Sequence, residues 1–418
     1  MSQKQLQRIV VIENAVAGRV SVAEAAEALG RSVRQVKRLK RMFDCAEPSW
    51  VLHGNQSRTP VNRTPEQLRR RIIELARGKY AGFNDTHLRE KLVREEAIAV
   101  SRSTVRRILR AAGLRSPQKR RSAKYRSRRV RRAQEGMLLL IDGSCHDWLE
   151  GRGPELTLLG LVDDATGKVA AAYFQVEHEN SAGYLRLLRG VVEGPGIPLA
   201  LYRDQHSSLQ RNDGHWSLEE QLAGNQLPTQ VGQALQDLGV EIIVARSPQA
   251  KGRMERLWRT FQDRLVSELR LAKAATLEQA NAVLARFLDD YNRQFAKVPR
   301  QAGSAYRKLD RRLDLDRIFS LRYQRKVGND HVIRVGPGLK VQLPPLAGKQ
   351  GFAGRTVQVC HAPDGYIRVY LDDRLLLQQA ADPWAGPVRA FDMQRSTAPR
   401  KKKPLRVYPF AGRPALRT

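Results

Sequence analysis

Cysteine is scarce in this chain, which has three cysteines in 418 residues. Cys45, Cys145 and Cys360 lie far apart, so neither a disulfide framework nor a paired-cysteine zinc site is indicated. The N-terminus lacks the apolar core of a signal peptide, and no run approaches the ~18 apolar residues of a membrane span. These absences predict a soluble cytoplasmic protein without a membrane partner.

Two common catalytic signatures are also missing. Without a Gly-Lys-Ser/Thr phosphate loop, nothing indicates that the chain hydrolyses ATP. Without a Gly-x-Ser-x-Gly elbow, acyl-transfer chemistry has no support.

Acidic residues are outnumbered. The chain has 42 Asp and Glu against 74 Lys and Arg, which gives a formal net charge of +32. Such a charge attracts polyanions at long range. Because the basic residues cluster on helix-turn-helix patterns, we expect the chain to bind nucleic acid. A ribosomal-type or merely solvated basic protein and a membrane-surface role are the alternatives.

The first helical region, residues 1–46, reads as a helix-turn-helix domain. Ser21 with Glu24 three residues on has the spacing of a capping box, and Gly30 ends that helix. The next helix, 32–43, is basic on its outward side, as in helix-turn-helix proteins. An ordinary three-helix bundle with a solvated basic face is the alternative. The predicted DNA contacts here are Arg34, Lys37, Arg38 and Arg41.

A second helix-turn-helix domain is predicted at 64–114, after a polar linker at 47–63. Thr64-Pro65-Glu66 opens its first helix, and the basic helix follows Ser101. Two such domains in tandem could bind an extended DNA site. The predicted DNA contacts here are Arg102, Arg106 and Arg107.

A basic arm is predicted at 115–134. Residues 115–132 hold ten Lys or Arg and no acid. Blocks of like charge are usually disordered until they meet a partner. We expect the arm to follow DNA phosphates or a minor groove, with a solubilising linker as the alternative.

From Met137 onward, strands alternate with helices. Three strands in meander precede alternating helices and strands, which is the order of a ribonuclease H-like fold by analogy. This core is predicted at 135–310. Short strands and turns at 319–380 predict a small antiparallel barrel, and a basic flexible tail follows at 387–418. The fold class is therefore multidomain: all-α helix-turn-helix units, an α/β ribonuclease H-like catalytic core and a small all-β barrel.

Three acids stand out by position. Asp142 ends the predicted strand 137–141, Asp204 ends the fourth strand, and Glu255 lies one turn into the helix after the fifth. In this strand order the first and fourth strands are neighbours, so the three carboxylates would meet. An Asp at a strand end is by itself an ordinary cap. Clustered carboxylates repel one another, and two Mg²⁺ ions, with Mn²⁺ as a substitute, would relieve that repulsion and serve phosphoryl transfer.

The helix of Glu255 has a basic face. Lys251, Glu255 and Arg259 stand at i, i+4 and i+8, on one side of the helix. We expect Lys251 and Arg259 to hold DNA phosphates beside the metal ligand. An exposed salt-bridge ladder is the alternative interpretation.

These residues carry a family resemblance. The block Ser-Pro-Gln-Ala-Lys-Gly-Arg-Met-Glu255-Arg resembles the third-carboxylate block of insertion-sequence transposases and retroviral integrases. Ile-Asp142-Gly-Ser-Cys-His-Asp-Trp-Leu-Glu-Gly with Arg-Asp204-Gln-His-Ser-Ser is similar to the ISNCY group of these transposases. The resemblance spans about residues 1–310. It implies a DDE-type transposase with a retroviral-integrase-like catalytic core, whose triad is Asp142, Asp204 and Glu255.

The chain departs from the common integrase pattern in two places. Fifty residues separate Asp204 from Glu255, a longer interval that fits an insertion near 211–228. Gln-His follows the second acid where many relatives of integrase have Asn-Gly, although Gln-His suits the ISNCY group.

The implied function is a DNA transposase that binds terminal inverted repeats of double-stranded DNA and performs metal-dependent cleavage and strand transfer. Because two DNA ends must be held together, at least a homodimer assembled on DNA is expected, nucleoid-associated when bound. A ribonuclease H-like nuclease without strand transfer, and a DNA-binding regulator with an inactive core, are the alternatives.

Overall fold

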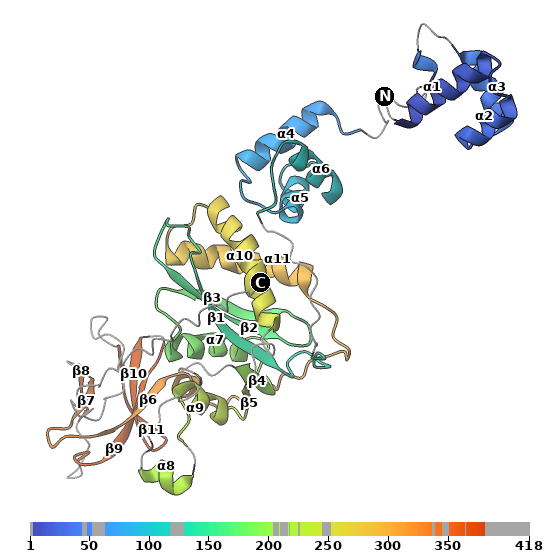
Figure 1. Ribbon diagram of the computed structural model, residues 1–418. Coiled ribbons are helices and arrows are strands. Elements are labelled where there is room, and N and C mark those ends of the chain that lie inside the picture. Colours follow the sequence, from blue (N-terminus) through green and yellow to red (C-terminus); the bar gives the residue numbers. More distant parts are fainter. Residues whose placement is uncertain are drawn as a thin grey trace, which may run out of the picture. The chain divides into compact units, whose positions relative to one another are not determined.

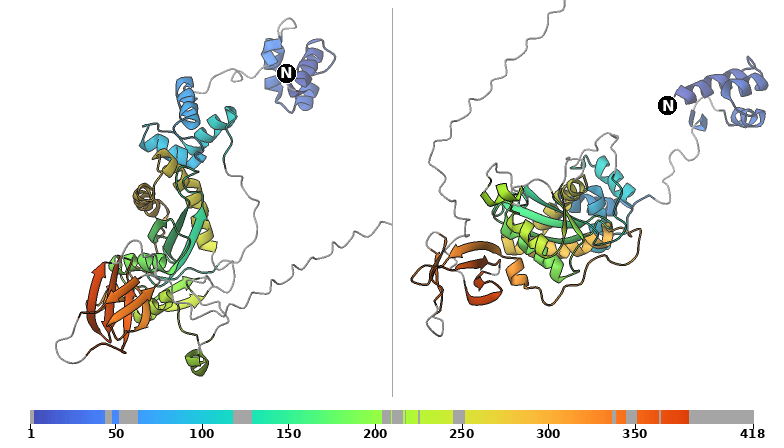
Figure 2. Two further views of the ribbon diagram at one scale, coloured as in Figure 1. Left: turned by 90° about the vertical axis from the view of Figure 1, so that its left-hand side faces the viewer. Right: turned by 90° about the horizontal axis from the view of Figure 1, so that it is seen from below.

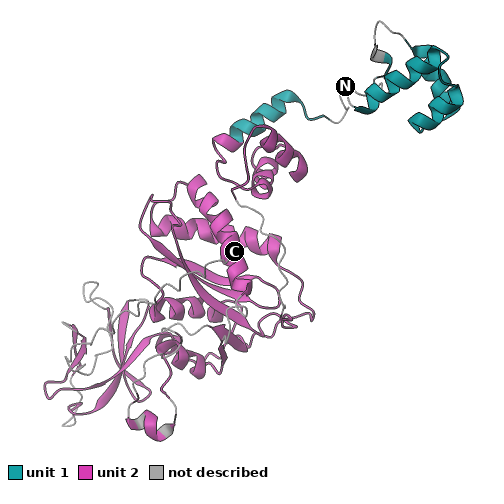
Figure 3. Cartoon of the chain, viewed as in Figure 1, with its two compact units in different colours: residues 1–75 teal, residues 76–418 magenta. Residues whose placement is uncertain are grey.

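A computed structural model describes most of the chain between residues 3 and 380. The described residues are 3–43, 48–51, 63–117, 129–203, 209, 216, 218–224, 226–244, 252–336, 339–344, 351–363 and 365–380. The chain divides into two compact units, 1–75 and 76–418 (Figure 3). The predicted tail at 387–418 and most of the predicted linker at 47–63 lie outside the described residues.

The first unit begins with three helices, α1 (Gln3–Val16), α2 (Val22–Leu29) and α3 (Val33–Met42). The predicted capping box is confirmed, because the Ser21 hydroxyl accepts from the Glu24 N–H and the Glu24 carboxylate accepts from the Ser21 N–H. Gly30 ends α2 in the left-handed region, at φ +60°. A buried core joins the three helices and the short 3-10 helix η1 (Pro48–Val51) that follows: Ile12, Ala15, Ala25, Ala26, Val36, Trp50 and Val51.

Helix α4 (Glu66–Arg77) opens after Pro65, as predicted, and reaches the boundary between the units. The second unit begins its helical part with α5 (Asp85–Arg94) and α6 (Arg102–Ala111). Both are capped by their preceding residue: Asn84 Oδ1 accepts from two backbone N–H groups of α5, and Ser101 Oγ accepts from one of α6.

A five-stranded mixed sheet forms the middle of the second unit, in the order β3-β2-β1-β4-β5 (Figure 1). β1 pairs antiparallel with β2 and parallel with β4, so the predicted neighbours do lie side by side. The strands are β1 (Leu139–His146), β2 (Leu156–Asp163), β3 (Val169–Gln175), β4 (Ala200–Arg203) and β5 (Glu241–Val244).

One predicted boundary is wrong. The first strand was predicted to end at Asp142, whereas β1 continues to His146. The reason is its pairing, because β2 accompanies β1 over its whole length while β4 pairs only with Leu139 and Leu140. Asp142 therefore lies within the strand, just past its parallel pairing with β4.

Helices cover both faces of the sheet (Figures 1 and 2). Because strand residues alternate in direction, Leu138 and Leu140 join the apolar core under two long helices, while Leu139 and Ile141 join the core on the opposite face. The long helices are α10 (Gly252–Leu271) and α11 (Leu277–Phe295). The other face carries α7 (Ser181–Glu193) and α9 (Gln230–Asp237), and α8 (Leu218–Ala223) lies between β4 and α9 in sequence.

After the short helix α12 (Leu315–Ile318), the C-terminal strands form two antiparallel sheets. Val335 and Val341 of the smaller sheet share an apolar core with Val359 and Val369 of the larger. Closure into a barrel stays a prediction. The larger sheet holds β6 (Leu321–Lys326), β9 (Thr356–His361), β10 (Tyr366–Leu371) and β11 (Arg374–Ala380), and the smaller holds β7 (Val332–Gly336) and β8 (Leu339–Gln342). None of the described helices is long and apolar enough to cross a membrane.

Candidate active site

Asp142 is joined to α10 by a hydrogen bond. The indole Nε1–H of Trp258 donates to Asp142 Oδ2 at 3.0 Å. Gly160 of β2 stands opposite Asp142 in the strand register, and a Cβ at that position would lie 2.8 Å from the Trp258 ring. A side chain there would displace the indole, so the glycine makes room for the contact.

Glu255 lies in the first turn of α10 and is exposed. Trp258 follows three residues later, which places both on the same side of the helix. Further along, Gln262 Nε2 donates to Ser144 Oγ at 3.4 Å, so α10 follows β1. Met254 and Phe261 are fully buried and hold the helix on the sheet. Glu255 is thereby brought to the strand that carries Asp142.

Two of the predicted site residues lie outside the described residues. They are Asp204, which directly follows the last residue of β4, and Lys251, which directly precedes α10. Among the residues that the structure describes, no group of three His, Cys, Asp or Glu side chains could hold a metal ion. The metal site predicted from the sequence therefore stays a prediction.

The donor chemistry of Asp142 and Glu255 fits a hard divalent cation. Carboxylate oxygens are the ligands that Mg²⁺ takes in proteins. The indole N–H that binds Asp142 is a neutral donor, so this bond orients the carboxylate without cancelling its charge. Trp258 was not predicted as a site residue, although a tryptophan three residues after Glu255 was a usable signal.

The remaining predicted DNA contacts are all exposed. Lys40 of α3 donates to the Ala15 carbonyl, and Arg110 of α6 pairs with Asp85 at 2.7 Å, so these two stabilise their own helical units. None of the predicted contacts forms such an ion pair with a described residue. They are Arg34, Lys37, Arg38 and Arg41 of α3, Arg102, Arg106 and Arg107 of α6, and Arg259 of α10.

Two of these arginines meet at one cavity. Arg102 begins α6 and Arg259 lies one turn after Glu255 on α10, and both line a cavity of about 380 Å³. Thr86, Ser116 and Thr260 contribute hydroxyl groups to the same wall. The basic start of α6 is therefore beside the helix of Glu255.

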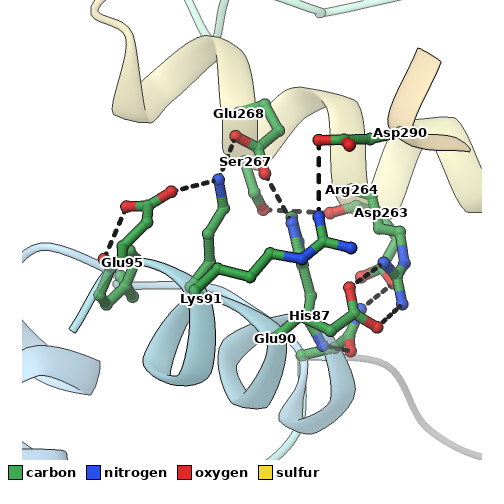
Figure 4. Close-up of polar contacts among 12 residues, drawn as sticks. His87, Glu90, Lys91, Glu95, Asp263, Arg264, Ser267, Glu268 and Asp290 are labelled. Atoms are coloured by element: carbon green, nitrogen blue, oxygen red, sulfur yellow. Dashed lines mark hydrogen bonds and ion pairs between the residues drawn. The ribbon is translucent and has the colours of Figure 1, made fainter. Parts of the chain in front are cut away.

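A charged interface attaches α5 to α10 (Figure 4). Glu268 of α10 lies 2.7 Å from His87 Nε2 and accepts from Lys91 Nζ at 2.8 Å. Arg264 of α10 donates to both oxygens of Glu90, at 2.7 and 3.1 Å. These partners are mostly buried, so the interface fixes α5 on the helix that carries Glu255.

The interface shifts the pKa of its carboxylates. Burial alone would raise the pKa of Glu268, but the hydrogen bonds from His87 and Lys91 outweigh it and hold that pKa below its usual range. Burial would also raise the pKa of Glu90. The hydrogen bond and the charge of Arg264 outweigh burial, and the pKa of Glu90 is lowered. Both acids are therefore held in their charged form by α5–α10 contacts.

Comparison with known proteins gives consistent matches. The family model described as an integrase core domain matches residues 236–295, which include Glu255 and Arg259. A Sinorhizobium fredii protein named as a transposase, y4bF, is 36% identical over 396 residues, 94% of this chain and 82% of that protein. The transposase for insertion sequence IS1202 of Streptococcus pneumoniae is 28% identical over 411 residues, 89% of this chain and 85% of that protein.

Among solved structures, the chain matches a simian T-cell lymphotropic virus intasome in complex with a PP2A regulatory subunit. The match has 13% identity and a TM-score of 0.31, over 74% of this chain and 99% of that chain.

Proposed function

Since the chain belongs to the insertion-sequence transposases with an integrase-like core, we propose that it cuts and joins the ends of its own mobile element. The chain would bind the terminal inverted repeats, cleave a strand there and use the freed 3′-hydroxyl to attack target DNA. Each step is a phosphoryl transfer without a covalent enzyme intermediate.

The hydrogen bond between Trp258 and Asp142 carries this proposal. It joins α10 to the strand of one predicted ligand at a point three residues after Glu255, which supports Glu255 as another ligand. β4 runs parallel to β1, with Leu140 paired to Tyr202. Counting two residues forward from that pair reaches Asp142 in one strand and Asp204 after the other, which supports the third ligand.

In this proposal Asp142, Asp204 and Glu255 hold two divalent metal ions, Mg²⁺ or Mn²⁺. The metal ions would stabilise the attacking and leaving oxygens of the transfer. Trp258 orients the Asp142 carboxylate, because its N–H fixes one oxygen. Lys251 and Arg259 stand four residues before and four residues after Glu255 in the sequence, so they are candidates to bind the DNA phosphates on either side of the scissile bond.

Recognition of the insertion element is assigned to α3 and α6. Their exposed arginines and lysines are available to phosphates and base edges. Two ends must be held for strand transfer, so we propose that at least two copies assemble on DNA. The charge of +32 disfavours association of free copies, and DNA would neutralise it.

A strand-transfer assay tests the proposed function. The full-length protein is incubated with labelled element ends, target plasmid and Mg²⁺, and compared with Asp142→Ala and Asp204→Ala. We expect the wild-type protein to form joined products and both substitutions to abolish them. Cleavage without joining would instead indicate a nuclease, and binding with neither product a regulator with an inactive core. Mass photometry with and without end DNA measures the assembly.

A further inference from the structure

The turn between β2 and β3 is buried, which is unusual for a hairpin turn. Asp164, in this turn, has a side chain that is 0% exposed. The turn lies under residues 129–132, the last part of the predicted basic arm. Arg131 donates to the carbonyls of Asp164 and Ala165, and Arg132 N–H to the Asp164 carboxylate. Part of the arm is therefore bound to the core.

The Asp164 carboxylate binds two arginine side chains from distant parts of the chain. Arg129 donates to Asp164 Oδ1 at 2.5 Å, and Arg253 forms an ion pair with the same oxygen. A carboxylate that is buried away from water is stable only when it is paired with a cation and hydrogen-bonded. The need for these contacts fixes the positions of Asp164, Arg129 and Arg253. Arg253 also donates to the Arg129 carbonyl at 2.8 Å, which closes the cluster.

The cluster joins the three elements that carry the proposed triad. The Asp164 N–H donates to the Leu138 carbonyl, next to β1. The Arg129 guanidinium lies 5.8 Å from the centre of the Tyr202 ring in β4. Arg253 belongs to the first turn of α10.

Glu255 stands between two fixed points of α10. Arg253, two residues before it, is bound to Asp164, and Trp258, three residues after it, is bound to Asp142. The first turn of a helix lacks internal partners for its N–H groups and frays readily. Metal ligands must be held within roughly 0.5 Å of their working geometry, so such a turn needs an anchor.

We infer that Asp164 is a positioning residue that sets the place of Glu255 through Arg253, and that Arg129 makes this depend on the bound arm. The catalytic part of this inference rests on the proposed function. The structural part, an anchored first turn of α10, stands independently of it. The two parts therefore need separate measurements.

The structural part is tested by hydrogen exchange on full-length Arg253→Gln. Amides of residues 256–259, whose partner carbonyls lie in the first turn, should exchange at least about tenfold faster, because local opening of this turn becomes easier. Arg253→Lys, which keeps a cation, should recover most of the protection. Arg189→Gln is the matched control, since Arg189 pairs with Glu193 and Asp316 away from α10. Unchanged exchange in Arg253→Gln would overturn the inference, whatever the protein's activity.

The catalytic part is tested by Mn²⁺ binding, followed by electron paramagnetic resonance without DNA. Losing a group that orients a metal ligand typically costs roughly 10–100-fold in affinity. We expect about tenfold weaker Mn²⁺ binding in Arg253→Gln and Asp164→Asn, recovery in Arg253→Lys, and no change in Arg189→Gln. Should Asp164→Asn fail to fold, the two Arg253 variants still decide. Wild-type affinity in Arg253→Gln would refute the role of Asp164, whereas no Mn²⁺ binding by the wild type would refute the metal site itself.

Discussion

The glutamates at the two ends of α10 differ in exposure and in their partners. Glu255, near the start, is exposed and forms no ion pair with any described residue. Glu268, near the end, is 19% exposed and is bound by both His87 and Lys91. One helix thus leaves a carboxylate exposed at one end, where we propose that it binds a metal ion, and uses another carboxylate to attach α5 at the other end. Exposure and partners, rather than residue type, separate the two roles.

The largest expected effect is at the start of α10. Glu255→Gln should lower DNA cleavage by at least about a thousandfold, because loss of an essential catalytic group typically removes most of the rate enhancement. DNA affinity and thermal stability should stay near wild type, since Glu255 supports no described contact. Glu278→Gln, an exposed glutamate in the first turn of α11, is the control. Near-normal cleavage by Glu255→Gln would contradict the catalytic role proposed for the glutamate at the start of α10.

The second effect concerns the far end and should appear as stability. Arg264→Ala leaves Glu90 buried without its main partner and should lower the free energy of unfolding of this unit. The loss should be on the order of 2–3 kcal/mol, below the roughly 3–5 kcal/mol of a fully buried pair, because both side chains keep slight exposure. Urea denaturation measures the loss. The double variant Glu90→Gln/Arg264→Ala should recover part of it, and a loss equal to the sum of the two single-variant losses would argue against a direct pair.

A third, smaller effect is a dependence on pH. The pKa values of Glu268 and Glu90 lie below the ordinary 4.5, so these acids bind fewer protons in the folded state than in the unfolded state. Their stabilisation is complete above that value and is lost as the pH falls through the lowered folded pKa values. The thermal unfolding temperature, measured at several pH values from about 6 to about 3, should decline below about pH 4.5. Glu268→Gln should flatten this decline, and an identical profile would contradict the assignment.

The smallest effect extends the comparison to the two basic helices. Arg38→Glu on α3 and Arg106→Glu on α6 should each weaken binding to element ends by several-fold. Each should also reduce the slope of log affinity against log salt concentration by about one, the value for one lost phosphate contact. Arg312→Glu is the control, because this exposed arginine lies on neither helix and pairs with Asp310. Titrations at several stated salt concentrations give both quantities, and equal effects of all three substitutions would deny these helices a special role.

Local patterns predicted much of this architecture. The capping box at Ser21 and the adjacency of β1 and β4 follow from short-range spacing and strand order. The end of β1 did not, because its length depends on the partner strand β2. The helices of the second predicted helix-turn-helix domain were recognised, but the attachment of α5 to α10 was not predicted. Glu90 and Glu268 resemble solvated charges when each helix is considered alone.

The candidate site was predicted in part. Asp142 and Glu255 stood out by their positions in strand and helix, and the structure brings their elements together through Trp258. Asp204 lies outside the described residues, so its place stays a prediction. Asp164 carries no distinguishing sequence signal, because an Asp in a turn needs no further explanation. Its arginine partners are distant in sequence, and no local pattern announces such a contact.

The buried turn between β2 and β3 also bears on how such proteins diverge and how they can be tagged. Turns of this kind usually accept added residues, because solvent surrounds them. Here inserted residues would have to displace Arg129 and Arg131 from Asp164 and Ala165. Length variation among relatives should therefore avoid this turn, and an epitope or fluorescent label belongs elsewhere on the chain.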